Sequence, residues 1–257
     1  MNSLLNIVLA CLFSGLVSLL LAGWLAFKLP TNVVGRMVAF AAGTMLAAAL
    51  LDILPEAFSL APGHAESLFA TVLAALVGFY LLERGALWRH SHPGDDDHGH
   101  SHHSHHASQQ GVAWALLVGD GVHNFVDGVL LAAAFLADPW VGVTATLAVM
   151  AHEVPQELGD FVLLLQAGWN KRWALLANAA SCLTSVLGGV VGWYALDGAH
   201  GALPYALAVA AGSFLYIAVA DLMPLLHQRR RIDGFLPQSA LMAAGLLSIP
   251  LVGHWLH

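Results

Sequence analysis

Acidic, imidazole and amide side chains gather in two neighbouring apolar stretches of this chain, at 112–136 and 141–167. The first stretch spaces four of them at i, i+3, i+4 and i+7, namely Asp120, His123, Asn124 and Asp127. In the second, His152 and Gln156 are spaced i, i+4, and Glu153, Glu157 and Asp160 are spaced i, i+4, i+7. Residues at such spacings share a face of an α-helix, so each stretch predicts a helix with polar stripes.

These polar groups are costly in a helix that crosses a membrane. Each charge near mid-span costs roughly 2.5–3.5 kcal/mol, and neither stretch contains a lysine or arginine that would balance the acids. A bound cation or protons must therefore compensate them. Imidazole nitrogen together with carboxylate and amide oxygen suits Zn²⁺ and tolerates Fe²⁺, Mn²⁺ or Cd²⁺. The residues thus favour a metal site between the two helices.

Three other interpretations of the same residues stay open. The groups could form a structural hydrogen-bond network, or a proton relay without metal, because carboxylates and histidines also carry protons. The segment from His152 to Gln156 is also similar to the His-Glu-x-x-His motif of zinc hydrolases, which would make the chain an intramembrane zinc-dependent hydrolase. Gln156 replaces the second histidine of that motif and Pro155 interrupts it, so we expect a protein that is not an enzyme.

The composition places these stretches in a membrane protein. The 257 residues are 58% hydrophobic and 10% charged, with a mean hydropathy of +0.73, whereas soluble proteins carry roughly 25% charged residues. The formal net charge of −7 excludes the basic surface of a nucleic-acid-binding protein. Cys11 and Cys182 both lie in apolar runs, which indicates neither a disulfide framework nor a thiolate metal site.

The hydropathy pattern predicts an all-α polytopic membrane protein with eight transmembrane helices in a single domain over residues 1–257. The spans lie at 4–27, 34–58, 67–88, 112–136, 141–167, 174–196, 203–226 and 236–255, each near the length that crosses a bilayer. All nine lysines and arginines fall on one membrane face of this topology. Because basic residues mark the cytoplasmic face, we expect both termini on the extracytoplasmic side of the cell (inner) membrane.

The long polar segment 90–110, between the third and fourth spans, is rich in histidine. Its candidate metal-buffering residues are His98, His100, His102, His103, His105 and His106. Several imidazoles in a low-complexity tract can bind zinc weakly and exchangeably. The segment is therefore predicted to be a cytoplasmic metal-buffering loop, or else a solvated linker with incidental metal affinity.

Other spans carry isolated residues that could support the site. Asp52 in 34–58 and Asp221 in 203–226 each precede a proline by three residues, and they are either waypoints for an ion or braces for the proline positions. Met45 is either a thioether ligand or a packing residue. The Gly188-x-x-x-Gly192 pair in 174–196 indicates close helix packing.

The segments 123–128 and 152–161 resemble the paired signatures of the ZIP (Zrt/Irt-like) metal transporters, most closely those of the histidine-rich subfamily. The eight spans, the outside termini, the histidine loop and the segments 40–43 and 212–216 are also similar to that family. The resemblance covers nearly the whole chain. It implies a ZIP-like fold, in which the first three and last three helices form an inverted repeat.

The resemblance also implies a homodimeric permease that moves metal into the cytoplasm. By matching positions, the ligands of a two-metal centre would be His123, Asn124, Asp127, His152, Glu153 and Gln156. Secondary candidate metal ligands are Met45, Glu157, Asp120, Asp52, Asp160 and Asp221. Gln156 stands where the subfamily usually has histidine. The first, fourth, fifth and sixth helices would slide as a transport unit against the other four.

Together these observations predict a divalent-cation uptake transporter with Zn²⁺ as its substrate and Fe²⁺, Mn²⁺ and Cd²⁺ as alternatives. Its partners would be the metal ions, the lipid bilayer and a second copy of the chain. Asp52 and Asp120 would draw the ion in from outside, and the 90–110 loop would receive it on the inner face.

Overall fold

A computed structural model describes the backbone of residues 3–28, 31–91, 104–199, 201–224, 226 and 234–256. This part of the chain is helical apart from short turns and contains no strand. His98, His100, His102 and His103 of the predicted buffering loop lie outside the described residues. The backbone of His105, His106 and Asp221 is described, but their side chains are not.

The described helices match the eight predicted spans. In chain order they are α1 (Ser3–Lys28), α2 (Thr31–Ala47), η1 (Ala48–Ile53), α3 (Leu54–Leu60), α4 (Ala65–Ser91), α5 (Ser104–Ala137), α6 (Pro139–Gln166), α7 (Lys171–Leu196), α8 (Leu203–Tyr216), η2 (Ile217–Leu222) and α10 (Phe235–Leu256). The second span is the run α2, η1 and α3, and the seventh is α8 with η2. The fold is therefore that of a polytopic membrane protein built from helices.

Six segments of the described chain are long and apolar enough to cross a membrane, two fewer than the eight expected spans. They are Ser3–Trp24, Met37–Leu60, Leu116–Ala137, Lys171–Leu196, Leu203–Ala220 and Phe235–Val252, and Ala65–Leu81 in α4 is a shorter apolar helix. Helix α6 is not among the six. It carries Glu153, Glu157 and Asp160, so the helix that is richest in candidate ligands is too polar to be recognised as a membrane span from its hydropathy alone.

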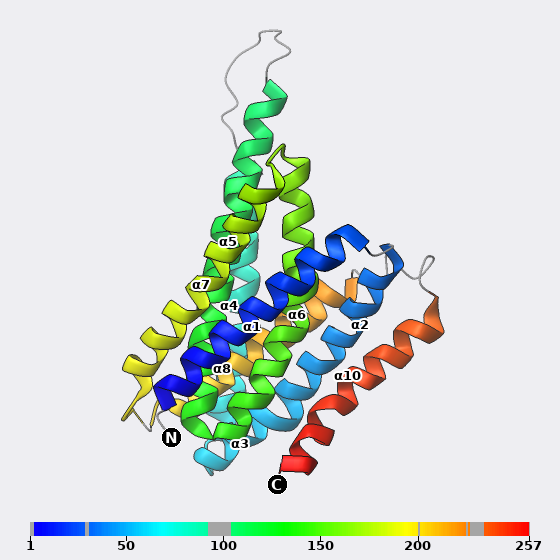
Figure 1. The fold of residues 1–257 in the computed structure, drawn as a ribbon. Helices are drawn as coiled ribbons and strands as arrows, with labels where there is room; N and C mark the ends of the chain where they lie inside the picture. The colour runs from blue at the N-terminus through cyan, green and yellow to red at the C-terminus, as the bar shows by residue number, and fades with distance from the viewer. Residues whose placement is uncertain are drawn as a thin grey trace.

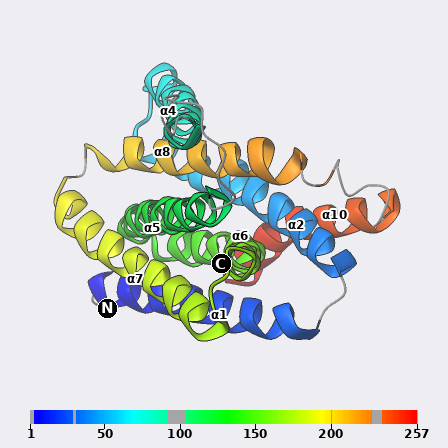
Figure 2. The same cartoon turned by 90° about the horizontal axis from the view of Figure 1, so that it is seen from above.

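Helix α6 lies inside the bundle. Figure 2 shows α5 and α6 flanked by α1 and α7 on one side and by α8, with α4 beyond it, on the other. Helix α6 contacts α1, α2, α5, α7 and α10. The ends marked N and C lie at the same end of the bundle (Figure 1), as an even number of spans requires. Helix α6 is thus surrounded by protein, which shields its acids from lipid.

Two features of the sequence set where α6 and α7 begin. The Asp138 side chain accepts a hydrogen bond of 2.7 Å from the backbone N–H of Trp140 and thereby caps α6, with a proline at the next position. The Asn170 side chain caps α7 by accepting from the N–H of Trp173 at 3.0 Å. Asp and Asn are favoured caps because they satisfy backbone donors that have no partner within the helix.

Glycines hold α7 tightly against α5. A Cβ atom added to Gly188 would overlap the backbone carbonyl of Phe125, and one added to Gly192 would lie 3.0 Å from the Cα of Val129. Gly128 on α5 meets the carbonyl of Ser185 in the same way. The packing role predicted for the Gly188-x-x-x-Gly192 pair is confirmed, because any larger side chain would push these two helices apart.

The prolines that follow Asp52 and Asp221 each come after a π-helical turn. The N–H of Leu54 donates to the carbonyl of Ala49 at the end of η1, and the N–H of Met223 donates to Ala218 at the end of η2. A π turn relieves the clash between a proline ring and the carbonyl four residues earlier. Asp52 accepts a hydrogen bond from the hydroxyl of Thr144 on α6, so it joins η1 to α6, a contact that the interpretation as a brace for the proline did not include.

Candidate metal centre

Four of the predicted ligands converge where α5 faces α6. One ligand atom from each of His123, Asp127, His152 and Glu153 lies within 4.8 Å of the others. The Nε2 atom of His152 lies 3.1 Å from Asp127 Oδ2 and 3.3 Å from His123 Nε2, and His123 Nε2 lies 3.5 Å from the same Asp127 oxygen. This spacing is small enough for one ion to contact two imidazoles and two carboxylates.

Glu153 brings an uncompensated carboxylate into the cluster. Its Oε1 atom lies 3.7 Å from His152 Nε2 and 3.9 Å from His123 Nε2, which is too far for a hydrogen bond. Both of its oxygens, and Oδ1 of Asp127, are buried and have no hydrogen-bond partner among the residues that the structure describes. Buried carboxylate oxygens are normally paired, because leaving them unpaired is expensive. A cation at the centre of the cluster would supply the partner that these oxygens lack among the described residues.

The surrounding protein orients the His152 ring. Its Nδ1 atom lies 3.0 Å from the backbone carbonyl of Ala148, one turn earlier in α6. A carbonyl only accepts hydrogen bonds, so Nδ1 donates to it, and Nε2 is the ring nitrogen that faces the cluster. His152 is 1% exposed, and its ring lies edge-on to Phe214 of α8, with 6.1 Å between centroids. Phe214 belongs to the segment 212–216 that is similar to the family, and it helps to wall the site.

Asn124 and Gln156, the other two predicted ligands, contact Asp120. Oδ1 of Asp120 accepts from Nδ2 of Asn124 at 3.1 Å and from Nε2 of Gln156 at 3.0 Å. The structure therefore links α5 and α6 a second time, beside the four-residue cluster. Oδ2 of Asp120 is buried, and no described residue donates a hydrogen bond to it. It leaves one further acceptor that a cation or proton could occupy.

Glu157 faces α7. Its Oε1 accepts from the thiol of Cys182 at 3.2 Å, and its backbone carbonyl accepts from Nδ2 of Asn178 at 3.1 Å. Cys182 thus contacts a buried carboxylate. Its position in an apolar run of the sequence did not indicate this contact. Asp160, one turn further along α6, is 8% exposed. Met45 on α2 is fully buried within the apolar core, which favours its packing role.

Comparison with known proteins decides the family. The family model of the ZIP zinc transporters matches residues 83–253, more than half of the chain and the part that contains the whole cluster. The chain belongs to the ZIP zinc transporter family. This confirms the resemblance carried by the segments 123–128 and 152–161.

Several ZIP relatives share more than a third of the matched residues. Zinc transporter ZIP10 of Homo sapiens is 38% identical over 144 residues, which are 54% of this chain and 17% of the relative. Metal cation symporter ZIP14 of Danio rerio is 39% identical over 143 residues, 53% of this chain and 28% of the relative. Zinc transporter foi of Drosophila melanogaster is 39% identical over 137 residues, 53% of this chain and 19% of the relative. The matched part of this chain therefore spans between 17% and 28% of the length of these relatives.

Proposed function

We propose that this ZIP protein transports a divalent cation across the membrane, with Zn²⁺ as its substrate, through the cluster of His123, Asp127, His152 and Glu153. The observation that carries the proposal is the buried Glu153 carboxylate, which has no hydrogen-bond partner in the described part of the chain and lies less than 4 Å from two imidazole nitrogens. A cation that contacts all four groups satisfies this carboxylate and Asp127 together, which no described side chain does.

The donor set supports zinc as the preferred substrate. Two imidazole nitrogens with two carboxylate oxygens form a four-coordinate set that suits Zn²⁺, while Fe²⁺, Mn²⁺ and Cd²⁺ accept the same donors. The relatives described above are named as zinc transporters or a metal cation symporter. Asn124 and Gln156 would turn their amide oxygens toward a second ion beside Asp120, which would complete a two-metal centre.

The direction of transport is the one that the resemblance to the ZIP family implies, and the charge distribution supplies the orientation of the chain. All the basic residues lie on one face of the predicted topology, which places the termini outside and the 90–110 loop in the cytoplasm. We propose uptake into the cytoplasm across the cell membrane by a homodimer, past Asp52 and Asp120 on the outer side. Asp221 would lie on the inner route, and His98, His100, His102, His103, His105 and His106 would buffer the arriving ion.

Uptake of radioactive zinc into proteoliposomes tests the proposal. His123→Ala and Glu153→Gln should each abolish uptake, because each removes a donor from the cluster. Glu66→Gln, at the exposed start of α4, is the matched control and should transport as the wild type does. Uptake by either cluster variant at the wild-type rate would show that the ion does not pass through this site. Competition by Fe²⁺, Mn²⁺ and Cd²⁺ would then rank the substrates.

The buffering loop is tested separately by deletion of residues 92–106. We expect the deletion to change the rate or the regulation of uptake without stopping it, because the cluster between α5 and α6 stays intact. Complete loss of uptake in a folded variant would mean that the loop belongs to the transport path.

A proton relay is the second candidate, since the same unpaired carboxylates and facing imidazoles could pass protons. Liposomes that contain a pH-sensitive dye distinguish the two: a relay moves protons in zinc-free buffer, and a metal transporter does not. The hydrolase alternative predicts that Glu153→Gln abolishes cleavage of a substrate in a protein with no ion flux.

A further inference from the structure

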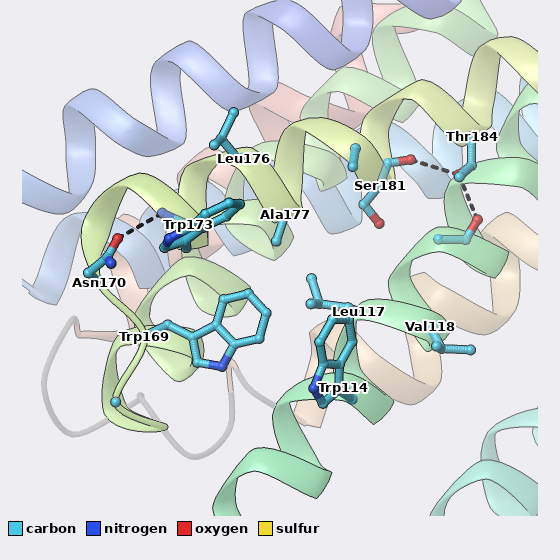
Figure 3. A pocket seen from close by; sticks show the side chains of 13 residues that line it. Trp114, Leu117, Val118, Trp169, Asn170, Trp173, Leu176, Ala177, Ser181 and Thr184 are labelled. Carbon is cyan, nitrogen blue, oxygen red and sulfur yellow. Dashed lines mark hydrogen bonds between the residues drawn. The ribbon is translucent and has the colours of Figure 1, made fainter.

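A groove opens between α5 and α7, at the end of the bundle where α6 connects to α7. Its volume is about 830 Å³, and we call it the tryptophan groove after its lining by Trp114, Leu117, Trp169, Trp173, Ala177 and Ala180. Figure 3 shows the three indole rings around its mouth, with Ser181 and Thr184 at its far end. The groove is distinct from the metal cluster, none of whose four residues lines it.

The mouth of the groove is aromatic and exposed. Trp114 and Trp173 are 60% and 62% exposed, and the rings of Trp114 and Trp169 meet edge-on with centroids 5.4 Å apart. Tryptophans gather where a membrane protein crosses from hydrocarbon to headgroups, since the ring is apolar and its N–H needs a polar partner. The mouth therefore lies at the membrane–water interface.

Below the mouth the groove is apolar. Exposed Leu176 and Ala180 of α7 line it on one side, and Leu117 and Val118 of α5 line it on the other. An apolar trough that runs from an interfacial mouth into the hydrocarbon depth fits an acyl chain.

Two basic residues adjoin the mouth. Lys171 and Arg172 line a second hollow of about 580 Å³, which shares Asn170, Trp173 and Leu176 with the tryptophan groove. Both basic side chains are exposed at the start of α7. A cationic pair beside an aromatic mouth and an apolar trough is complementary to an amphiphile with an anionic headgroup. Basic sites of this kind between membrane helices bind anionic lipid headgroups.

We propose that this site binds an anionic phospholipid, with an acyl chain in the tryptophan groove and the phosphate against Lys171 and Arg172. The cytoplasmic leaflet carries the anionic lipids, and the basic pair lies on the face predicted to be cytoplasmic. Metal binding plays no part in this assignment, which therefore goes beyond the proposed transport. The groove ends at Thr184, whose hydroxyl donates to the carbonyl of Gly121 at 2.6 Å, one residue from Asp120. A bound chain would thus reach the depth of the metal cluster.

Native mass spectrometry of the purified full chain, titrated with dioleoyl phosphatidylglycerol or dioleoyl phosphatidylcholine, tests the site. The wild type should retain phosphatidylglycerol about 25-fold more tightly than phosphatidylcholine, because two basic contacts are made with the anionic headgroup. Loss of one basic contact near a membrane surface weakens binding about fivefold, so the double variant Lys171→Gln/Arg172→Gln should bind phosphatidylglycerol about 25-fold more weakly and leave phosphatidylcholine unchanged. Arg229→Gln/Arg230→Gln removes a basic pair of the same predicted face and should keep the wild-type preference.

A second variant tests the acyl-chain part of the site. Ala180→Phe places a ring in the trough at an exposed position and should weaken both lipids. The proposal would be overturned if the wild type retained the two lipids equally, or if Lys171→Gln/Arg172→Gln kept the preference for phosphatidylglycerol. It would also be overturned if Arg229→Gln/Arg230→Gln lost as much phosphatidylglycerol binding as Lys171→Gln/Arg172→Gln. If the wild type instead forms dimers without bound lipid and Ala180→Phe dissociates them, the groove is an interface with a second copy of the chain. Zinc binding in the same samples is a separate readout, so failure of the transport proposal would leave the lipid result intact.

Discussion

Replacing Glu153 with glutamine separates the two parts that a buried carboxylate can play, structural support and ion binding. Neither carboxylate oxygen of Glu153 accepts a hydrogen bond from a described residue, and the side chain is 1% exposed. Glutamine keeps the shape and removes the negative charge. Glu153→Gln therefore breaks no hydrogen bond of the metal-free protein and removes a buried unpaired charge, so we expect its melting temperature to fall by no more than about 2 °C, less than about 1 kcal/mol.

Zinc binding should respond far more strongly. Removal of one partner from a buried charge pair costs about 3–5 kcal/mol, which corresponds to an affinity loss of about 100-fold or more. Zinc at 100 times the wild-type Kd stabilises the wild type by about 2.7 kcal/mol, or about 5–10 °C for a chain of this size. At the same zinc concentration a variant that binds 100-fold more weakly gains about 0.4 kcal/mol, so its shift should be about 1 °C.

Tryptophan fluorescence during heating measures both quantities, because the chain contains eight tryptophans. The detergent-solubilised protein is melted at neutral pH with a chelator and then with increasing zinc. Glu66→Gln serves as the control and should show the full wild-type zinc shift. A wild-type shift in Glu153→Gln would refute the assignment of Glu153 to the ion, and a metal-free melting temperature lowered by 5 °C or more would show that the residue is structural.

Two further substitutions test the packing and the metal preference. Gly188→Ala should destabilise the fold by about 1–3 kcal/mol, because its Cβ would overlap the Phe125 carbonyl. Thermal melting compares it with the control Gly78→Ala, where the space around the added Cβ is open. Equal stability of the two variants would contradict the packing argument. Gln156→His should raise zinc affinity at least about tenfold and favour zinc over Mn²⁺, because imidazole suits zinc better than an amide. Competition uptake in proteoliposomes measures the ranking, and an unchanged ranking would place Gln156 away from the ion.

Helical periodicity predicted the α5 half of the cluster well and the α6 half less well. His123 and Asp127 are one turn apart, so they share a face in any α-helix, and the structure brings them together. His152 and Glu153 are consecutive, and the spacing rule assigned them to different stripes. Both reach the cluster because α6 is enclosed by protein and α5 packs where the stripe of His152 meets the stripe of Glu153. Only the position of α6 within the bundle determines this.

Contacts between distant segments lay beyond reach of sequence patterns. The Cys182 thiol meets the Glu157 carboxylate across 25 residues of sequence, and the Thr144 hydroxyl meets Asp52 across 92. Glycine spacing in 174–196 predicted close packing on some neighbour but could not specify which one. The structure shows that this neighbour is α5, and its close approach carries Cys182 and Asn178 to the buried side of α6.

The polar contacts also bear on how the site could move. All four cluster residues lie on α5 and α6, and α7 is joined to both helices through the Thr184–Gly121 and Asn178–Glu157 hydrogen bonds. Toward the second span, the hydrogen bond between Thr144 and Asp52 joins α6 to η1. A displacement of α5, α6 and α7 as one body would keep every cluster distance and would have to break this contact. We therefore expect Thr144→Val to change the zinc uptake rate while the zinc-induced melting shift stays intact, and loss of that shift would show that the brace and the cluster are one structural unit.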